Sequence, residues 1–486
     1  MKIKQLQFYN TKTRKVERFI PKNKELVKIY SCGPTVYSYQ HIGNMKAAVF
    51  SDILRRVIKY AGYKLYSVQN ITDVGHLTDD DLLSDDGEDK MLKAAKKENK
   101  SPLQIAQYYT DYYFKDLERL HVELPDVMPK ATEHIQEQLN LIEKLEQNEV
   151  TYTTSDGVYF NVAKFPQYGF LSGQKLEEKE AGARVEVNNE KINPQDFALW
   201  KFTTGKHEQH LMKWNSKWGV GFPGWHIECS AMGHKYLGEH IDIHTGGVDH
   251  IPIHHENEIA QNVCSGCIKD VTFWMHNGHL TVNGEKMSKS VGNVYLIEDL
   301  VKKGYHPLAL RLLFLQSNYR KTSDFTFELL HSAQQNLNKI HQFVRELELR
   351  KVNSGEELNK DLQEQINREL EEFNIAVCDD LNTAKAIKNI YSVISYLNSL
   401  QEVSQKDKEL VIGFFNTVNR VLGILEQNKA QNKIPQKIYD LAVKRRDAKV
   451  SKDFKLADEL REEIQNLGFN IKDDKKVEGG FILTEK

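Results

Sequence analysis

Cysteine and long apolar stretches are scarce in this sequence. Five cysteines among 486 residues cannot build the disulfide framework of a small secreted domain, and they indicate a reducing, cytoplasmic environment. No apolar run reaches about 18 residues, so no bilayer-spanning segment is expected. Residues 1–15 are basic but no apolar stretch follows them, which argues against a secretory signal or a transit peptide.

An excess of either charge is also absent. The 66 Lys and Arg residues nearly balance 68 Asp and Glu residues, and the formal net charge is -2. This balance excludes an overall polybasic coat for nucleic acid, although a local basic surface remains compatible with it. Aromatic residues are plentiful: 21 Phe, 21 Tyr and 5 Trp can fill a large core, so a disordered chain is excluded. At roughly 100–200 residues per domain, the length predicts two to four domains.

The N-terminal part predicts a parallel α/β arrangement. Residues 26–32 mix β-branched and apolar residues like a buried strand, and a helical pattern runs from His41 until Gly62 ends it. Residues 64–72 are typical of the next strand. A strand, a helix and a second strand in this order form a βαβ unit, which predicts a parallel sheet.

The segments that follow differ in character. Residues 79–89 are acidic and are expected to form a solvated loop. Residues 90–148 predict helices, whereas residues 151–162 predict a β-hairpin that turns at Asp156 and Gly157. We interpret these short strands and turns as an insertion between two halves of the α/β domain.

The C-terminal half changes from α/β to helical. Residues 221–291 return to α/β character, and beyond them apolar spacings of three and four predict amphipathic helices. A polar linker with one proline, 427–437, marks a boundary. The final module predicts basic helices and a short hairpin made by residues 468–474 and 479–483.

The sequence HIGN, His41 to Asn44, lies at the turn after the first predicted strand. A helix N-terminus with outward backbone N–H groups favours an anion, and Gly43 lets the backbone approach it. His41 and Asn44 would add donors for phosphate. An ordinary strand-to-helix turn is the alternative.

The sequence KMSKS, Lys286 to Ser290, lies in a predicted loop between Gly284 and Gly292. Two lysines and two serines in a mobile loop can close over a polyphosphate and stabilise charge on a leaving pyrophosphate. By itself this segment could equally be a solvated loop.

Together HIGN and KMSKS resemble the signature of class I aminoacyl-tRNA synthetases. The resemblance implies a Rossmann-like, parallel-sheet catalytic domain of the α/β class, an inserted α+β segment, a helical bundle and a small C-terminal module. The five parts are the first half of the catalytic domain (1–120), the connective insertion (121–220), the second catalytic half with zinc ligands and the KMSKS loop (221–296), the helical stem-contact and tRNA-binding domain (297–426), and the small anticodon-binding module (427–486).

A candidate metal site is scattered along the chain. Thiolate and imidazole groups suit zinc, and four ligands are the usual number. Cys32 ends the first predicted strand, Cys229 lies in GWHIECSAM, and His254 and Glu258 are four residues apart on one helix face. Spacing alone leaves open that both thiols are inert packing groups, because buried cysteines usually are.

A narrower resemblance bears on this choice. CGPTVY, GWHIECSAMG, DIHTGGVD, HHENEIAQ and KMSKS occur in this order, and with them the chain resembles the cysteinyl-tRNA synthetase family over nearly its whole length. AGARVEV (181–187) and NPQDFALWK (193–201) are similar to that family's insertion, and ADELREEIQNLGF (457–469) to its C-terminal module. The resemblance implies one Zn2+ per subunit, with His255 not as a ligand but as a residue that supports a ligand or packs beside it. The implied ligands are Cys32, Cys229, His254 and Glu258.

The resemblance also implies the other site residues. The catalytic residues, which hold phosphates and stabilise developing charge, are His41, Asn44, Lys286 and Lys289. The ATP-binding residues are His41, Gly43, Asn44, Gly246, Asp249 and Lys289. The substrate-binding residues are Gly33, Thr72, Trp225 and His244; the alternative for Trp225 is a core aromatic.

The implied activity is attachment of L-cysteine to tRNA(Cys) in the cytoplasm. The carboxylate attacks the α-phosphorus of ATP, and the terminal ribose of tRNA then attacks the cysteinyl-adenylate. Mg2+ accompanies ATP, and a monomer without a membrane partner is expected. Size alone separates similar substrates by roughly 1–3 kcal/mol. Zinc instead binds thiolate in preference to hydroxyl, so we hypothesise that the substrate sulfur becomes a further zinc ligand.

Some features depart from the family's commonest form. Asn44 replaces a second histidine, so it can donate to phosphate but carries no charge. The stretch after Thr72, DVGHLTDDDLLSDDGEDK, is longer than the usual DVDDK, which puts the local loop contacts in question. Cys264 and Cys267 form a CxxC pair without a second ligand pair, and we interpret them as incidental. Cys378 is expected in the core.

Three other activities fit parts of the pattern. A ligase that joins cysteine to a small amine would share zinc, HIGN and KMSKS but would not need the helical tail. A non-catalytic RNA-binding paralogue would be expected to lose a motif, and a zinc hydrolase would need HExxH.

The basic residues that would contact tRNA phosphates, or else form a solvated helix face, are Lys444, Arg445, Arg446, Lys449 and Lys452.

Overall fold

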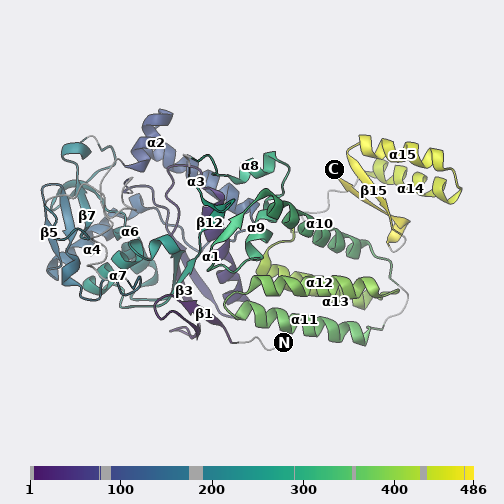
Figure 1. Ribbon diagram of the computed structural model, residues 1–486, viewed down its shortest axis with the longest axis horizontal. Helices are drawn as coiled ribbons and strands as arrows, with labels where there is room; N and C mark the ends of the chain where they lie inside the picture. Colours follow the sequence, from purple (N-terminus) through teal and green to yellow (C-terminus); the bar gives the residue numbers. More distant parts are fainter. Residues whose placement is uncertain are drawn as a thin grey trace. The chain divides into compact units, whose positions relative to one another are not determined.

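The computed structural model describes residues 5–75, 77, 89–173, 190–208, 210–288, 291–352, 357–426, 435–474 and 477–485. The chain forms two compact units (Figure 1): the larger comprises residues 2–330 and 377–382, the smaller residues 331–376 and 383–486. Within the described ranges, no helix has both the length and the apolar character needed to cross a membrane. Most of the acidic stretch 79–89, the segment 181–187 and most of the linker 427–437 lie outside these ranges.

A four-stranded parallel sheet forms the centre of the larger unit. Its strands are β3 (Val27–Ser31), β4 (Leu65–Gln69), β10 (His240–Gly247) and β11 (Asp270–Asn277), in the order β11-β10-β3-β4. All three strand pairs are parallel. The predicted α/β class and the predicted βαβ unit are therefore confirmed.

Helix α1 (Ile42–Tyr60) connects β3 to β4 as predicted. It ends before Gly62, whose φ of 90° lies in the left-handed region that favours glycine. The buried Asp52 on α1 accepts hydrogen bonds from Arg56 Nε at 2.8 Å and from Arg311 Nη2 at 2.6 Å. Burial opposes ionisation of Asp52, but the Arg311 and Arg56 cations lower its pKa. Because Arg311 lies on α9 (Pro307–Leu315), this network fixes α1 against α9.

The predicted helical region 90–148 is interrupted. It contains α2 (Lys90–Glu98), α3 (Pro102–Arg119) and α4 (Ile135–Gln147). Between α3 and α4, Val127 and Lys130 form bridges with Val68 and Ile71, and a 3-10 helix (Ala131–His134) leads into α4. Pairing with the edge strand β4 thus satisfies backbone groups that a continuous helix would have used internally.

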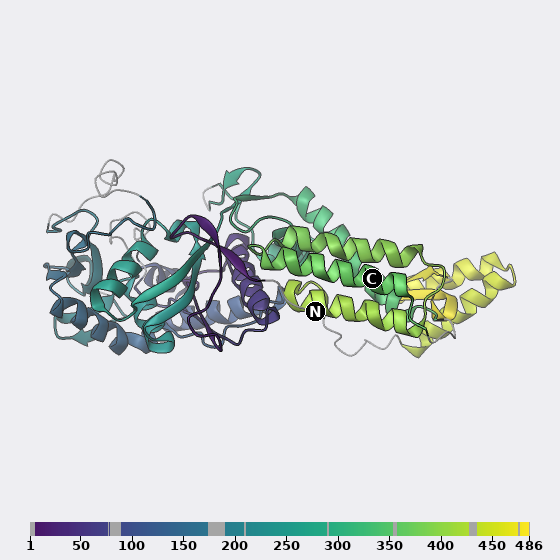
Figure 2. The ribbon, with the colours of Figure 1, turned by 90° about the horizontal axis from the view of Figure 1, so that it is seen from below.

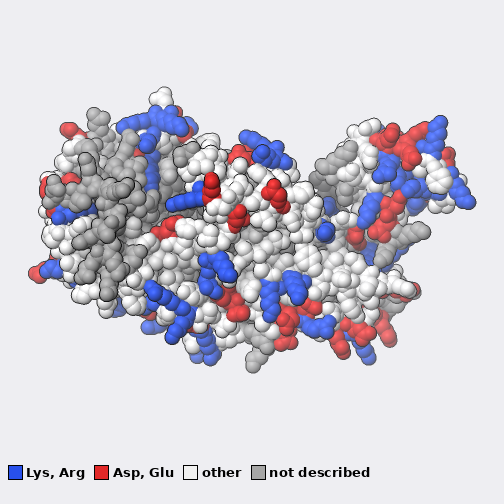
Figure 3. All heavy atoms as spheres, in the orientation of Figure 1, with Lys and Arg blue, Asp and Glu red and all other residues white. Residues whose placement is uncertain are grey.

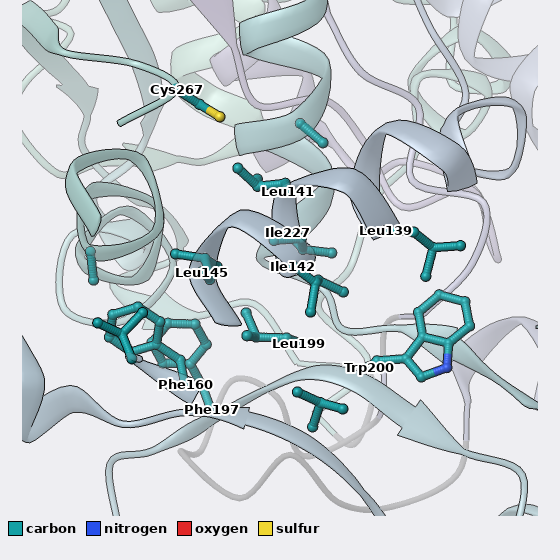
Figure 4. Packing of buried hydrophobic residues seen from close by; sticks show 14 of the residues in the cluster. Leu139, Leu141, Ile142, Leu145, Phe160, Phe197, Leu199, Trp200, Ile227 and Cys267 are labelled. Atoms are coloured by element: carbon teal, nitrogen blue, oxygen red, sulfur yellow. The ribbon is translucent and has the colours of Figure 1, made fainter. Parts of the chain in front are cut away.

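The insertion forms an antiparallel sheet in the order β5-β6-β7-β9-β8. Its strands are β5 (Thr151–Thr153), β6 (Gly157–Phe160), β7 (Phe197–Phe202), β8 (Trp214–Ser216) and β9 (Gly219–Pro223). The β5–β6 pair confirms the predicted hairpin. Figure 4 shows Ile142 and Leu145 of α4 above Leu199 of β7 in the core that covers this sheet. Cys267 belongs to the same core and accepts a hydrogen bond from Lys144 Nζ at 3.2 Å.

A small sheet carries the first part of KMSKS. It consists of β12 (Leu280–Val282), β13 (Glu285–Lys286) and β14 (Ser323–Phe325), in the order β13-β12-β14. Strand β12 is antiparallel to β13 and parallel to β14. The chain therefore enters KMSKS from a hairpin whose β12 strand is paired on both sides.

The C-terminal part is helical, as predicted. Helices α11 (Lys360–Cys378), α12 (Thr383–Ser399) and α13 (Gln405–Leu422) run side by side in both views (Figure 1, Figure 2). Helix α10 (Phe327–Leu349) precedes them, and Cys378 is buried as expected. The final module has α14 (Gln436–Val450), α15 (Phe454–Asn466) and the antiparallel pair β15 (Phe469–Asp473) and β16 (Phe481–Glu485), which confirms the predicted hairpin.

Candidate functional site

Four side chains that are far apart in sequence meet beside the parallel sheet. Cys32 directly follows β3, Cys229 lies on α6 (Ile227–Leu237), and His254 and Glu258 lie on α7 (His254–Ser265). Their ligand atoms all lie within 4.8 Å of one another, and Cys229, His254 and Glu258 are buried. The structure therefore brings together the four residues predicted as zinc ligands.

Glu258 is the centre of this cluster. Its Oε1 lies 3.1 Å from His254 Nε2 and 3.7 Å from Cys32 Sγ. Its other oxygen, Oε2, pairs with His244 Nε2 at 2.8 Å. His226 Nδ1 lies 2.9 Å from His254 Nδ1 and thereby orients the His254 ring. His244 thus occupies Glu258 Oε2 and His226 occupies His254 Nδ1, which leaves Glu258 Oε1 and His254 Nε2 facing the cluster.

The protonation pattern of the cluster is that of a site built for a cation. Burial would raise the pKa of Cys229, but a hydrogen bond from Cys32 and the charge of His254 lower it to about 6. Burial disfavours the His254 imidazolium, yet Cys229 and Glu258 raise its pKa to about 10. Burial also opposes ionisation of Glu258, but His244 and His254 hold its pKa well below the usual range. Burial and Cys229 raise the pKa of Cys32. A thiolate and a carboxylate thus share one imidazolium, and a divalent cation would replace its proton.

A second donor set overlaps the first. Cys32, His244, His255 and Glu258 also have ligand atoms within 4.8 Å of one another. His255 Nε2 lies 3.2 Å from Cys32 Sγ, and its Nδ1 lies 2.8 Å from His276 Nε2. Burial and the neighbouring histidines lower the pKa of His255 well below its ordinary value, so its ring is neutral. This second set contains one thiol instead of two, and the softer first set suits zinc better.

The predicted substrate residues surround the cluster. Thr72 Oγ1 donates to Glu228 Oε2 at 2.8 Å, next to Cys229. The Trp225 ring stacks on His254 with centroids 4.5 Å apart. His244 is buried between Trp274 and Glu258, so its ring lies behind a ligand. A Cβ on Gly33 would lie 1.6 Å from Asn70 O, which shows that only glycine fits there. Their roles in binding substrate stay predictions.

HIGN forms a capping box that the sequence analysis missed. His41 Nδ1 accepts from the N–H groups of Gly43 at 3.1 Å and Asn44 at 3.3 Å, and Asn44 Oδ1 accepts from His41 N at 3.1 Å. The expectation that these backbone N–H groups point outward is therefore wrong, because the His41 side chain occupies them. With Nδ1 as acceptor, the ring N–H lies on Nε2, and its contact with phosphate stays a prediction. The three-residue spacing of His41 and Asn44 was the signal for this box.

The remaining nucleotide-site residues lie on different segments. Lys286 ends β13 and is exposed, whereas Lys289 lies outside the described residues. Asp249 is 68% exposed, and its Oδ2 lies 3.3 Å from His279 Nδ1. A Cβ on Gly246 would lie 2.6 Å from His250 Nδ1, so packing alone requires glycine there. Contact of any of these residues with ATP stays a prediction.

The basic residues of the last module are partly used within the protein. Arg445 is buried and pairs with Asp473 Oδ1 at 2.6 Å, and Lys449 contacts the same carboxylate. Arg446 Nη2 donates to Asp447 Oδ1 at 2.8 Å. Figure 3 shows blue and red side chains interspersed over this module. Lys444 and Lys452 are exposed and remain available for a phosphate backbone.

The sequence analysis missed the residues behind the ligands. Three buried residues were not predicted. His226 contacts His254, and Glu228 accepts a hydrogen bond from Thr72. His276 contacts His255. For His226 and Glu228 a signal existed, because both lie within the motif GWHIECSAM. His276 lies outside the quoted motifs, and only the pairing of β10 with β11 brings it beside the site.

Comparison with known proteins identifies related families. The model "tRNA synthetases class I (C) catalytic domain" matches residues 18–335, and the DALR domain model matches residues 372–426. A cysteine–tRNA ligase of Treponema denticola is 41% identical over 96% of this chain and 98% of its own length. A cysteine–tRNA ligase of Thermus thermophilus is 40% identical over 97% of this chain and 98% of its own length.

A solved structure supports the fold alone. The Mycobacterium tuberculosis methionyl-tRNA synthetase in complex with methionyl-adenylate matches with a TM-score of 0.56 at 14% identity. The match covers 82% of this chain and 90% of that one.

Proposed function

The chain belongs to the cysteine–tRNA ligase family of class I synthetases, and from that premise we propose how its residues perform the reaction. The reaction is ATP-dependent attachment of L-cysteine to tRNA(Cys). It proceeds through cysteinyl-adenylate, formed when the cysteine carboxylate displaces pyrophosphate from ATP. The terminal ribose hydroxyl of tRNA then takes the cysteinyl group and releases AMP.

The cluster of four candidate ligands, three of them buried, is the observation that carries this proposal. Cys32, Cys229, His254 and Glu258 would hold one Zn2+ per subunit, because two thiols, an imidazole and a carboxylate are a zinc donor set. When bound, Zn2+ would lower the pKa of a substrate thiol and bind the thiolate, for which a serine hydroxyl is a poor substitute. Trp225, stacked on His254, would wall the side of the pocket where that thiol enters.

Thr72 and Gly33 would complete the amino-acid pocket. Thr72 is held by Glu228 and by Asn70 Nδ2 at 3.0 Å, so its hydroxyl is fixed before substrate arrives. Gly33 N donates to Asn70 Oδ1 at 2.8 Å. One asparagine therefore positions both residues, and the pocket needs little reorganisation on binding. His244 would act by orienting Glu258.

HIGN and KMSKS would act on the phosphates. His41 offers Nε2–H, and Asn44 holds the His41 backbone in the capping box. Lys286 and Lys289 would stabilise the charge that develops on the leaving pyrophosphate. Gly43, Gly246 and Asp249 would line the nucleotide. Mg2+ would accompany ATP through its phosphate oxygens.

The helical region and the last module would bind tRNA. The proposed boundaries are 297–426 for the stem-contact domain and 427–486 for the anticodon-binding module, after the catalytic parts 1–120, 121–220 and 221–296. Lys444 and Lys452 would contact phosphates. A monomer is proposed. A cytoplasmic location is supported by five free cysteines and by the use of tRNA as substrate.

The test is cysteine-dependent exchange between ATP and pyrophosphate, with serine as the control amino acid, followed by aminoacylation. We expect exchange with cysteine but not with serine, stoichiometric zinc, and charging of tRNA(Cys). Exchange followed by transfer to an aminosugar but never to tRNA would favour the small-amine ligase instead. Equal exchange with serine would contradict thiol recognition by the cluster.

A further inference from the structure

The side chain of Lys46 is buried in the larger unit although it carries an amine. It lies on α1, two residues after the HIGN sequence, and is 3% exposed. Its Nζ donates to the backbone carbonyls of Gly278 and His279 at 2.9 Å each and of Lys321 at 3.1 Å. An ammonium has three N–H donors, so these three carbonyls can use all of them.

The three carbonyls belong to the starts of two strands. Gly278 and His279 immediately precede β12, and Lys321 lies two residues before β14. These two strand starts approach closely: a Cβ on Gly278 would lie 2.5 Å from Lys321 O. His279 O also accepts from Ser323 N at 3.1 Å. A single ammonium on α1 thus gathers the starts of the two parallel strands of the small sheet.

The same small sheet leads directly into KMSKS. Strand β12 turns through Gly284 into β13, which ends at Lys286. Asp324 on β14 accepts from Thr281 Oγ1 at 2.7 Å and from Gly284 N at 2.9 Å, so the turn is tied to β14. Beyond it, Asn293 Nδ2 donates to Lys286 O at 3.2 Å. A shift at the strand starts would therefore be transmitted to the KMSKS loop.

The far end of the loop returns to the start of α1. Ile42 N donates to Tyr295 O at 2.9 Å. The His279 ring, next to the carbonyl that Lys46 binds, lies 3.3 Å from Asp249 Oδ2. Lys46 thus contacts the segment that joins KMSKS to the proposed nucleotide residue Asp249.

Resting on the proposed function, we infer that Lys46 is a positioning residue for adenylate formation, which holds the KMSKS-bearing strands at a fixed distance from HIGN through three backbone carbonyls. It acts through KMSKS and does not touch the reacting atoms. Burial lowers the pKa of Lys46 to about 8, so the three-donor ammonium still predominates at pH 7. Transition-state stabilisation depends on this spacing, and displacements of about 1 Å can cost roughly 100-fold in rate.

The test compares Lys46→Met with the native enzyme at pH 7 in cysteine-dependent exchange. Methionine retains an unbranched apolar side chain but removes the donors. We expect kcat to fall by roughly 10- to 100-fold. Cysteine affinity measured without ATP and zinc content should stay within about twofold, since Lys46 contacts neither pocket nor ligands. Lys46→Arg, which keeps a multi-donor cation, should recover much of kcat. Lys59→Met, on the exposed end of the same helix, is the matched control and should match the native enzyme.

The outcomes separate positioning from a merely structural role. Unchanged kcat in Lys46→Met would overturn the inference, as would a parallel loss of kcat, cysteine affinity and zinc. An Arg variant as slow as the Met variant would overturn the hydrogen-bonding basis. If Lys46→Met does not fold, Lys46→Gln, which keeps one amide donor group, is judged by the same criteria. Absence of exchange in the native enzyme would instead contradict the proposed function.

Discussion

The methyl group of Met287 lies directly over Gly43. A Cβ at position 43 would stand 2.4 Å from Met287 Cε and 3.0 Å from the His41 ring. The third residue of HIGN and the second residue of KMSKS are therefore in contact. The glycine is needed here for this contact, in addition to any approach of a phosphate.

Gly43→Ala should slow adenylate formation. The added methyl group would push Met287 and the His41 ring away, and we expect the kcat of exchange to fall about tenfold, with cysteine affinity unchanged. The double variant Gly43→Ala/Met287→Ala removes one of the two clashing groups and should be faster than Gly43→Ala alone. If the decrease in log kcat of the double variant equals the sum of the decreases in the two single variants, the contact does not matter for the rate.

Metal content should discriminate between the two overlapping donor sets. We expect Cys229→Ser and His254→Ala to lose bound zinc, because both residues belong only to the two-thiol set. His255→Ala should retain zinc but release it to a chelator roughly 10- to 100-fold more readily, as expected for a residue behind a ligand. Elemental analysis of the purified variants is the measurement. Zinc lost from His255→Ala but kept by Cys229→Ser would assign the other set.

Two basic residues of the last module should behave differently. Arg445→Ala removes a buried side chain together with its ion pair to Asp473, whose carboxylate is half exposed and keeps Lys449, so it should destabilise the module by about 1 kcal/mol in urea unfolding. Lys452→Ala should leave stability unchanged but weaken tRNA binding and reduce its salt dependence by about one ion. Identical salt dependence in Lys452→Ala and the native protein would exclude a phosphate contact at this position.

Asp116 on α3 should make the larger unit less stable at neutral pH. Its Oδ1 lies 3.3 Å from Arg119 Nη1, while burial outweighs this attraction and raises its pKa to about 6, above the ordinary 3.8. Between these two pH values the folded state binds more protons than the unfolded state, so stability falls as pH rises through the window. The full cost, about 3 kcal/mol at about 1.4 kcal/mol for each pH unit, applies above pH 6.

Asp116→Asn should therefore raise the free energy of unfolding at pH 7 by about 1–2 kcal/mol, because the amide does not ionise and only the charge attraction to the partly exposed Arg119 is lost. The gain should shrink towards pH 4, where the native carboxyl is protonated. Chemical unfolding at both pH values checks this. A gain of equal size at pH 4 and pH 7 would show that ionisation is not the cause.

Local patterns in the sequence were sufficient to predict those helices and strands that depend on neighbouring residues. The apolar spacing after His41, the glycine at position 62 and the turn at Asp156 and Gly157 each concern neighbouring residues, so helix α1 and the β5–β6 hairpin could be predicted. The interruption between α3 and α4 could not, because it arises from pairing of residues 127–130 with the distant strand β4.

The sequence by itself determined which side chains could form the site, since thiols, imidazoles and a carboxylate recur in family-specific motifs. Only the tertiary structure decided which of them meet. Cys32 and Cys229 lie almost 200 residues apart. Parallel pairing of β3 with β10, the strand that follows α6, brings Cys32 at the end of β3 close to Cys229 on α6. It also showed that Arg445 is buried and that His41 binds its own helix. These features depend on burial and hydrogen bonding between segments that are far apart in the sequence. Local periodicity contains no information about such contacts.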